Sequence, residues 1–335
     1  YRAEDLEKGG VVAIKIFRSA AHFAKERGVR LSLRNHFGIA KFVVDDILVL
    51  DATQLKPTRP SDDVEALLAE FSGGAVVMPL AAYDLNTRLA LTRIAGANAT
   101  KCVAILKPVA EALSQLHHHG IVHGDVKPRN VVFIGGTWKL IDFDAARAGG
   151  ETIDASNGDV KWTSGFASPE LARCCEALGR IDARPSLDIF AFGVLAFELC
   201  SGQRLFAQDI CNNNMTSPSD LCRLCVWCDI SDEKLALVFS NDDVECCSAQ
   251  QREDARHFIR ACLQGDPLRR MSMDSLAQHR FLGGLIRPPS PRPTTLASQI
   301  DGTTLQRILS RDTLRPKYHI FISHNQKEAS GDVGT

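Results

Sequence analysis

The sequence predicts an α+β fold in which a strand-rich first part precedes a larger helical part. Within residues 1–80, short apolar runs bounded by Gly, Pro or charged residues are typical of β-strands. From about residue 100 onward, apolar side chains recur at three- and four-residue spacing, which is typical of helices with one buried face. The change of period separates the two parts of the chain.

Four runs in the first part favour strands, and two stretches favour helices. The expected strands are Val11–Phe17, Ala40–Val44, Ile47–Leu50 and Ala75–Pro79. A helix is expected near Ala20–Leu33, and Asp62–Phe71 is a candidate for a short inserted helix.

The second part carries the stronger helical signals. One amphipathic helix is predicted from the spacing of Val103, Leu106, Val109, Ala110, Leu113 and Leu116. Asp188–Leu199 is apolar nearly all round, as a fully buried helix should be. Further helices are expected over Asp254–Leu263 and Met273–Phe281.

Length and charge narrow the class of protein. The 335 residues suffice for one large or two ordinary domains. With 39 basic and 40 acidic residues, we expect no bulk attraction to nucleic acid or to an anionic membrane. The uncharged apolar runs fall short of the ~18 residues that a membrane span needs, so no span is expected.

The segment His123–Asn130 and the triplet Asp142–Asp144, twelve residues after Asn130, carry the strongest chemical signal. Together they offer two carboxylates, an amide and an ammonium, each on a short loop after an apolar run. Phosphoryl transfer from a metal nucleotide needs such a set. One Asp accepts the proton of the attacking hydroxyl and a Lys neutralises charge on the phosphoryl group. An Asn and a second Asp hold Mg²⁺.

These residues resemble the catalytic loop and the metal-binding motif of eukaryotic protein kinases, H-R-D-L-x-x-x-N and D-F-G. Four further segments resemble that family's motifs in its order: Val12–Lys15, Thr163–Glu170, Asp188–Gly193 and Asp266–Arg270. The resemblance covers about residues 1–286. It implies a two-lobed protein-kinase-like fold with a small β-rich N-lobe (1–80) and a larger helical C-lobe (81–286). It also implies that Arg270 pairs with Glu170.

The resemblance implies a role for each residue of the reaction centre. Asp125 would be the catalytic base, and Lys127 would contact the transferred phosphate. Asn130 and Asp142 would hold Mg²⁺, and Lys15 would bind the α- and β-phosphates of ATP. Lys127, two residues after Asp125, fits Ser/Thr kinases better than the tyrosine class, as does Thr163.

The adenine site is implied in the same way. Ala13 and Val132 would sandwich the adenine ring, with Met78 at the gatekeeper position of the strand before the connector. Ala81 belongs to the connector that receives adenine, and Asp84 would lie near the ribose.

Gly124 stands where the family has an Arg that grips a phosphorylated activation loop. Phosphorylation of Thr152 or Ser156 is therefore expected to activate the protein only modestly. Lys161 or Arg147 could substitute as the cationic partner of such a phosphate.

Two further positions depart from the family pattern. Asp144 replaces the Gly of D-F-G, so we expect an unusual backbone angle there at some cost and a stiffer loop. The family pairs the strand Lys with a helical Glu, for which Glu26 is the candidate. Counting back from His36 puts Arg27 in that place instead, so the Lys15–Glu26 pair stays open.

Both ends suggest a piece of a longer protein. The Gly-rich phosphate loop of the family would lie before Tyr1, and either it precedes this chain or it does not exist. Residues 287–316 are expected to form a Pro/Ser/Thr-rich linker, with a short helix at Thr303–Leu314. Residues 317–335 weakly resemble the start of a TIR-like domain, which would offer a signalling partner; an apolar stub is the alternative.

The 11 cysteines are expected to be reduced thiols, because the fold resembled is cytosolic. Cytoplasm is the expected location, with the nucleus as the alternative. Cys222, Cys225 and Cys228, with the pair Cys246-Cys247, could close a zinc site. Buried thiols on a helix are the favoured interpretation.

The sequence as a whole predicts an ATP- and Mg²⁺-dependent kinase that phosphorylates Ser or Thr hydroxyls of protein substrates. The alternative is a pseudokinase that binds nucleotide or acts as a scaffold, which the uncertain Glu26, Asp144 and the missing Gly-rich loop favour. Small-molecule phosphotransferases of the same fold are disfavoured by the segment Ser168–Glu170 and by Arg270.

Overall fold

The computed structural model divides into two compact units. It describes residues 2–5, 10–17, 19–34, 48–50, 55–57, 74–92, 94–158, 160–240, 247–283 and 318–321. Unit 1 comprises Tyr1–Arg27, Asp46–Leu80 and Ser290–Thr335, and unit 2 comprises Gly28–Asp45 and Ala81–Pro289. The helix α1 (Ala20–Arg34), expected over Ala20–Leu33, contributes residues to both.

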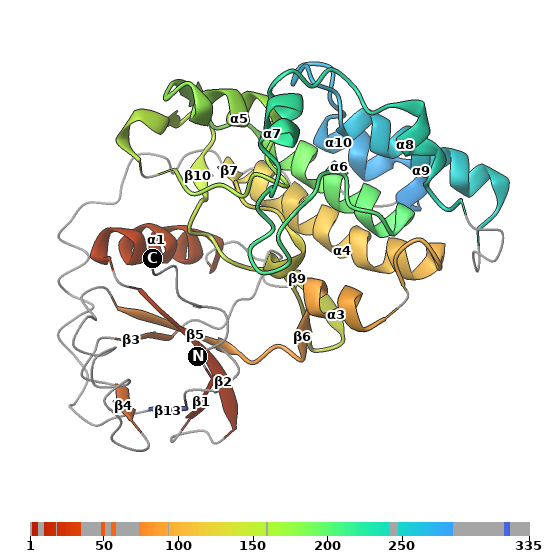
Figure 1. Ribbon diagram of the computed structural model, residues 1–335. Coiled ribbons are helices and arrows are strands. Elements are labelled where there is room, and N and C mark those ends of the chain that lie inside the picture. The colour runs from red at the N-terminus through yellow and green to blue at the C-terminus, as the bar shows by residue number, and fades with distance from the viewer. Residues whose placement is uncertain are drawn as a thin grey trace, which may run out of the picture. The chain divides into compact units, whose positions relative to one another are not determined.

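Unit 1 is built on a six-stranded sheet with the order β3-β5-β2-β1-β13-β4 (Figure 1). Its strands are β1 (Arg2–Asp5), β2 (Val11–Ile16), β3 (Leu48–Leu50), β4 (Leu55–Pro57), β5 (Ala75–Pro79) and β13 (Tyr318–Phe321). The β13–β4 pair is parallel and the other pairs are antiparallel. The strands predicted at Val11–Phe17, Ile47–Leu50 and Ala75–Pro79 are confirmed.

The pairing of β2 with β5 forms the centre of this sheet. Ile14 lies opposite Val77, and Lys15 lies opposite Val76. Ile14, Val76 and Val77 are buried. Branched side chains suit a pleated, half-buried surface, which explains why these short runs form strands.

Unit 2 is mainly helical. Its helices besides α1 are α3 (Leu85–Leu91), α4 (Ala99–His118), α5 (Pro169–Glu176), α6 (Pro185–Ser201), α7 (Pro218–Cys225), α8 (Asp232–Ala236), α9 (Ala249–Cys262) and α10 (Met273–Gln278). Helix α6 is buried from Leu187 to Cys200 and packs on α4 and α9. Its apolar sequence has no polar face, so it can only form the centre of a core.

Three small sheets complete unit 2. One has the order β6-β8-β9 and contains β6 (Tyr83–Asp84), β8 (Val131–Ile134) and β9 (Thr137–Leu140). The second pairs β7 (Ile121–Val122) with β10 (Arg147–Ala148), and the third pairs β11 (Thr152–Asp154) with β12 (Arg180–Asp182). These sheets hold the loops on which the sequence places the reactive residues.

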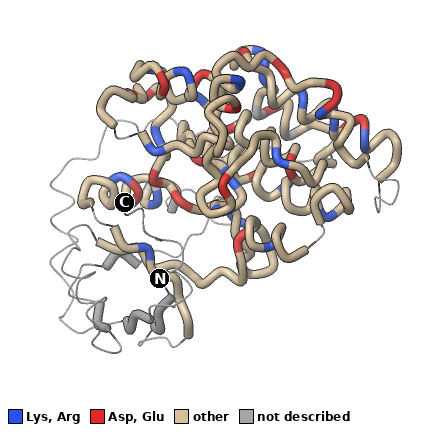
Figure 2. The backbone as a smooth tube through the Cα atoms, in the orientation of Figure 1, with Lys and Arg blue, Asp and Glu red and all other residues tan. Residues whose placement is uncertain are grey.

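Several expectations fall on residues that the structure does not describe. They are the strand Ala40–Val44, the helices Asp62–Phe71 and Thr303–Leu314, and the linker 287–316. In residues 317–335, the described segment is β13, which joins the sheet of unit 1. Among the described helices, none is both long and apolar enough to span a membrane. Basic and acidic residues are interspersed along the helices of unit 2 (Figure 2).

Candidate active site

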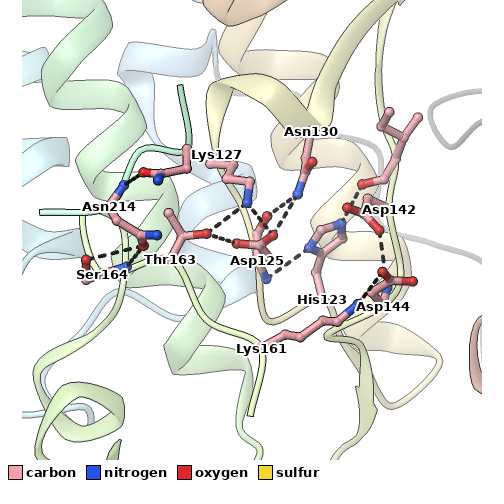
Figure 3. A network of polar contacts seen from close by, with 12 residues as sticks. His123, Asp125, Lys127, Asn130, Asp142, Asp144, Lys161, Thr163, Ser164 and Asn214 are labelled. Atoms are coloured by element: carbon pink, nitrogen blue, oxygen red, sulfur yellow. Dashed lines mark hydrogen bonds and ion pairs between the residues drawn. The ribbon is translucent and has the colours of Figure 1, made fainter. Parts of the chain in front are cut away.

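The carboxylate of Asp125 lies at the centre of a cluster of polar side chains in unit 2 (Figure 3). Thr163 Oγ1 donates to its Oδ1 at 2.6 Å, and Lys127 Nζ lies 2.7 Å from its Oδ2. Lys127 also donates to Thr163 Oγ1 at 2.8 Å. Asp125 and Lys127 keep a small exposed fraction, so the cluster is fixed by hydrogen bonds and still reaches solvent.

Asn130 is oriented by hydrogen bonds to Asp125. Its Nδ2 donates to the backbone oxygen of Asp125 at 2.8 Å and to Oδ2 at 3.1 Å. Its Oδ1 therefore faces away from Asp125 (Figure 3). The amide is thus held with its oxygen on the side away from the Asp125 carboxylate.

The hairpin β8–β9 brings Asp142 beside Asn130. Val131 lies opposite Leu140, and the Ile141 N–H donates to the backbone oxygen of Asn130 at 2.9 Å. Asn130 and Asp142 flank the open end of this hairpin. An amide oxygen and a carboxylate are the hard donors that Mg²⁺ prefers, so this pair fits the metal by the chemistry of its donor atoms.

The backbone before Asp125 is fixed by Asp188 near the start of α6. His123 N–H and Gly124 N–H donate to its two carboxylate oxygens at 2.7 and 2.8 Å, and His117 Nε2 donates at 2.7 Å. Burial alone would raise the pKa of Asp188. The hydrogen bond and charge of His117, together with the Gly124 N–H, outweigh it, so the pKa is lowered.

His123 serves as a packing and orienting residue. Its Nε2 lies 3.1 Å from the Ile141 oxygen, and its Nδ1 lies 3.2 Å from the Asp125 nitrogen. A carbonyl can only accept and a backbone N–H only donates, so these contacts assign the neutral tautomer protonated on Nε2. The buried ring also contacts Phe143.

Gly124 has a backbone requirement of its own. Its φ is +78°, and a Cβ built on it would lie 2.8 Å from the Ala145 oxygen. Both the angle and the space favour glycine. The departure from the family's Arg therefore matches the local backbone of this chain.

The unusual backbone angle expected at Asp144 occurs at a different residue. The left-handed backbone angle belongs to Asp142, with φ +72°, and Asp144 is not among the described residues with positive φ. The Asp144 carboxylate instead pairs with Lys161 at 2.7 Å (Figure 3). The departure from glycine thus adds an ion pair at a residue that has no unusual φ.

In unit 1, Lys15 Nζ pairs with Glu26 Oε2 at 2.6 Å. Glu26 is 0% exposed and the Lys15 side chain 24% exposed, so the carboxylate of the pair is shielded from bulk water. The count from His36, which favoured Arg27, is therefore wrong; His36 itself lies outside the described residues. The Lys15–Glu26 pair that the sequence left open does form.

The residues expected at adenine are organised separately in each unit. In unit 1, Ala13 lies directly opposite Met78 in the β2–β5 pair. In unit 2, which begins again at Ala81, Asp84 lies opposite Val132 in the β6–β8 pair.

Asp84 has a structural task as well. It caps α3, with Oδ1 accepting from Thr87 N–H at 2.8 Å and Oδ2 accepting from Thr87 Oγ1 at 2.7 Å. A contact of Asp84 with ribose would have to share these oxygens.

A second group of contacts, which the sequence did not reveal, holds the chain just after Thr163. Asn214 Oδ1 accepts from the Ser164 N–H at 3.1 Å, and Ser164 Oγ accepts from the Met215 N–H at 2.7 Å. The Gly165 N–H donates to the Asn213 oxygen at 3.2 Å. The loop after α6 thus braces the segment that carries Thr163.

Gly165 is closely approached by this loop. Gln208 Nε2 donates to the Gly165 oxygen at 3.2 Å and to Glu198 Oε1 at 2.9 Å. A Cβ at Gly165 would lie 2.6 Å from the Gln208 Cδ, so only glycine fits. Burial raises the pKa of Glu198 to about 7, despite the Arg204 charge and the Gln208 hydrogen bond.

The expected pair between Glu170 and Arg270 is confirmed. Arg270 Nη1 and Nη2 donate to the two Glu170 carboxylate oxygens, each at 2.6 Å. The Arg270 side chain is 0% exposed and also donates to the Ser186 and Gly265 oxygens. This fork fixes the start of α5, directly after the segment that carries Thr163.

The cysteine expectation needs a correction. Cys222 and Cys228 are exposed, so they are not buried thiols, and α7 ends at Cys225 before the third cysteine. Among the described residues, which exclude Cys246, no three cysteines lie close enough to bind one metal ion. Leu224, not a cysteine, fills the core beneath α7.

Parts of this sequence match known proteins. Residues 68–282, more than half of the chain, match the family model described as "Protein kinase domain". The chain is 38% identical over 108 residues to "Serine/threonine-protein kinase PknL" of Mycobacterium tuberculosis, covering 32% of this chain and 26% of that protein. It is 27% identical over 241 residues to "Serine/threonine-protein kinases drp72" of Corynebacterium efficiens, covering 69% and 41%.

A third relative, "Probable serine/threonine-protein kinase PknB" of Lactococcus lactis, is 36% identical over 110 residues, covering 32% of this chain and 17% of that protein. The chain therefore spans less than half the length of each of these relatives. The resemblance of residues 317–335 to a TIR-like domain has no support in these matches. The extent of the family match, together with the cluster around Asp125, shows that this chain belongs to the protein kinase family.

Proposed function

We propose that this chain transfers the γ-phosphoryl group of ATP to Ser or Thr hydroxyls of protein substrates. The observation that carries the proposal is the contact of Asp125 with both Thr163 and Lys127. Beside them, the NH₂ group of Asn130 donates to the same carboxylate. A general base, a cation and an oxygen donor for a metal then occupy one small site. The names of the relatives, all Ser/Thr protein kinases, support the same class of substrate.

Asp125 would accept the proton of the substrate hydroxyl as its oxygen bonds to the γ-phosphorus and the bond to the ADP leaving oxygen breaks. Lys127 would neutralise charge on the transferred phosphoryl group. Thr163, which bonds both side chains, would keep them at a fixed separation. Asn130 and Asp142 would hold Mg²⁺, which supplies charge neutralisation at the phosphate oxygens when bound.

The residues proposed for the nucleotide lie in both units. Lys15, held by Glu26, would bind the α- and β-phosphates, and Ala13 and Met78 would line the adenine site. Ala81, Asp84 and Val132 are the proposed contribution of unit 2. The formed Lys15–Glu26 pair removes one of the arguments for a pseudokinase.

The proposed substrates are proteins with exposed Ser or Thr. We keep the cytoplasm as the proposed location, with the nucleus as the alternative, because the described cysteines are free thiols.

The Asp125→Asn variant tests the proposal. Its amide cannot accept the proton, so turnover with Mg²⁺-ATP and a general protein substrate should fall by about two to four powers of ten. ATP affinity should stay nearly unchanged, because the base acts on the chemical step. The measurement is transfer of labelled phosphate together with ATP binding by calorimetry, on the full-length protein.

Asp182→Asn is the matched control, since it removes a half-exposed carboxylate of β12 that pairs with the exposed Arg184. Its turnover should equal that of the unchanged protein. Equal turnover of the Asp125→Asn variant would refute the assignment of the base. ATP binding without any transfer in the unchanged protein would establish the pseudokinase alternative.

A further inference from the structure

A cleft lies beside Gly124, where the family carries an Arg side chain. Apolar residues form most of its wall, among them Val122, Ile153 and Leu187. Its cationic lining residues are Arg147 and Lys161. A phosphate on the segment that follows Asp142 would need a cation at this place to be held.

Both of these cations already bind carboxylates. Arg147 Nη1 lies 2.6 Å from Glu151 Oε1, and Lys161 Nζ lies 2.7 Å from Asp144 Oδ2. The Arg147–Glu151 pair is local, because its partners are four residues apart. The Lys161–Asp144 pair joins residues that lie 17 positions apart.

The position of Lys161 connects this pair to the reaction centre. At one end, Asp144 follows the fully buried Phe143, so it is anchored to the core. At the other end, Lys161 precedes Thr163 by two residues, and Thr163 donates to Asp125. The ion pair therefore ties the end of the segment, next to Thr163, to its fixed beginning.

We propose that the Asp144–Lys161 pair does the work of an activation-loop phosphate in this chain. Asp144 supplies a permanent negative charge, and Lys161 is a positioning residue that holds Thr163 against Asp125. The segment would then be ordered without phosphorylation of Thr152 or Ser156. This inference rests on the proposed kinase function. It accounts for both departures from the family's motifs, at Gly124 and at Asp144.

A double-mutant cycle of Asp144→Asn and Lys161→Met tests the inference. Lys161 is 48% exposed, so the effect of the pair is modest. Each single variant should lower turnover about three- to five-fold, and the double variant should lose no more than either one. Lys161→Arg should restore most of the turnover, because it keeps the charge.

Protease cleavage within residues 145–163 gives a readout that does not depend on catalysis. Cleavage should accelerate about three- to five-fold in Lys161→Met, because the tie at the end of the segment is lost. Arg180→Met is the matched control. It breaks another 2.7 Å ion pair of this segment, with Asp154, that lies away from Thr163. Its turnover should stay unchanged, because the lost pair does not position Thr163.

Two results would overturn the inference: additive losses in the cycle with unchanged cleavage, or a hundred-fold loss of turnover when the unchanged protein is treated with phosphatase. If the unchanged protein transfers no phosphate at all, the proposed function fails, and the cleavage rates alone decide whether the pair orders the segment.

Discussion

The two ends of α6 carry buried carboxylates that differ in charge. Asp188, near the first turn, is 1% exposed, and Glu198, about 15 Å further along, is 7% exposed. Three N–H groups donate to Asp188, and its pKa is lowered. Glu198 receives hydrogen bonds from Gln208 and from the Leu205 N–H, yet burial raises its pKa to about 7. Similar burial therefore gives opposite shifts, because His117 adds both a hydrogen bond and a charge directly at Asp188.

Each carboxylate supports one side of the site. Asp188 holds the backbone at His123 and Gly124, directly before Asp125. Glu198 acts through Gln208 on Gly165, directly after the Thr163 segment. The backbone before Asp125 thus rests on an ionised carboxylate, whereas the segment after Thr163 rests on a group that titrates near neutral pH.

The largest effect is expected from removing the charge of Asp188 in the first turn of α6. Asp188→Asn replaces one acceptor oxygen by an NH₂ group that faces the existing donors. The free energy of unfolding should fall by about 3–5 kcal/mol, as for a buried pair that loses one partner. Urea unfolding measures it, and Asp182→Asn, at a half-exposed carboxylate, should change it by less than about 1 kcal/mol. An unaltered Asp188→Asn protein would mean that the three hydrogen bonds contribute little.

Glu198→Gln should change the pH dependence of the free energy of unfolding. The folded pKa of about 7 lies above the usual 4.5, so the stabilising effect of the neutral form is complete below pH 4.5 and is lost as pH rises through 7. Gln stays neutral and can still accept from Gln208. The variant should therefore equal the unchanged protein at pH 4.5 and exceed it at pH 8, by up to about 3 kcal/mol.

Thermal unfolding across pH 4.5–8 checks the Glu198→Gln prediction. Asp188→Asn provides the opposite sign, since a carboxylate with a lowered pKa contributes stability above its usual 3.8 that is lost as pH falls. A pH-independent difference between Glu198→Gln and the unchanged protein would contradict the raised pKa.

The smallest effect is expected at the segment after Thr163, where we expect a protein substrate to bind. Asn214→Ala removes the acceptor for the Ser164 N–H, which is worth about 1 kcal/mol. We expect the KM for a protein substrate to rise about two- to five-fold and the KM for ATP to stay constant. Asn214→Asp keeps an acceptor oxygen and should restore the KM. A change in both KM values would place the effect elsewhere.

Local patterns predicted the long elements and the reactive residues. The strands β2, β3 and β5 and the helices α4 and α6 follow directly from apolar spacing. The residues around Asp125 follow from motif spacing, because one short loop holds them. Helix α5, of eight residues, was missed because two turns show little periodicity. The helix expected to carry Cys222, Cys225 and Cys228 is α7, which ends at Cys225.

Contacts between distant segments were not predictable. Gln208 is 43 residues from Gly165, and Asn214 is 50 residues from Ser164, so no local pattern joins them. The choice between Glu26 and Arg27 depended on a one-residue count, which rotates a helical side chain by about 100°. Asp142 took the left-handed angle that the family pattern suggested for Asp144, since backbone angles depend on the whole loop.

The fork between Arg270 and Glu170 joins residues 100 positions apart. A chain emerging from a ribosome at about 5–20 residues per second would expose Glu170 about 5–20 s before its partner. Until then, the start of α5 lacks its buried cation, and the segment before it lacks a fixed end. We therefore expect the reaction centre to be completed late during synthesis. The catalytic loop is made first, and it is held in place only after Arg270 has been added.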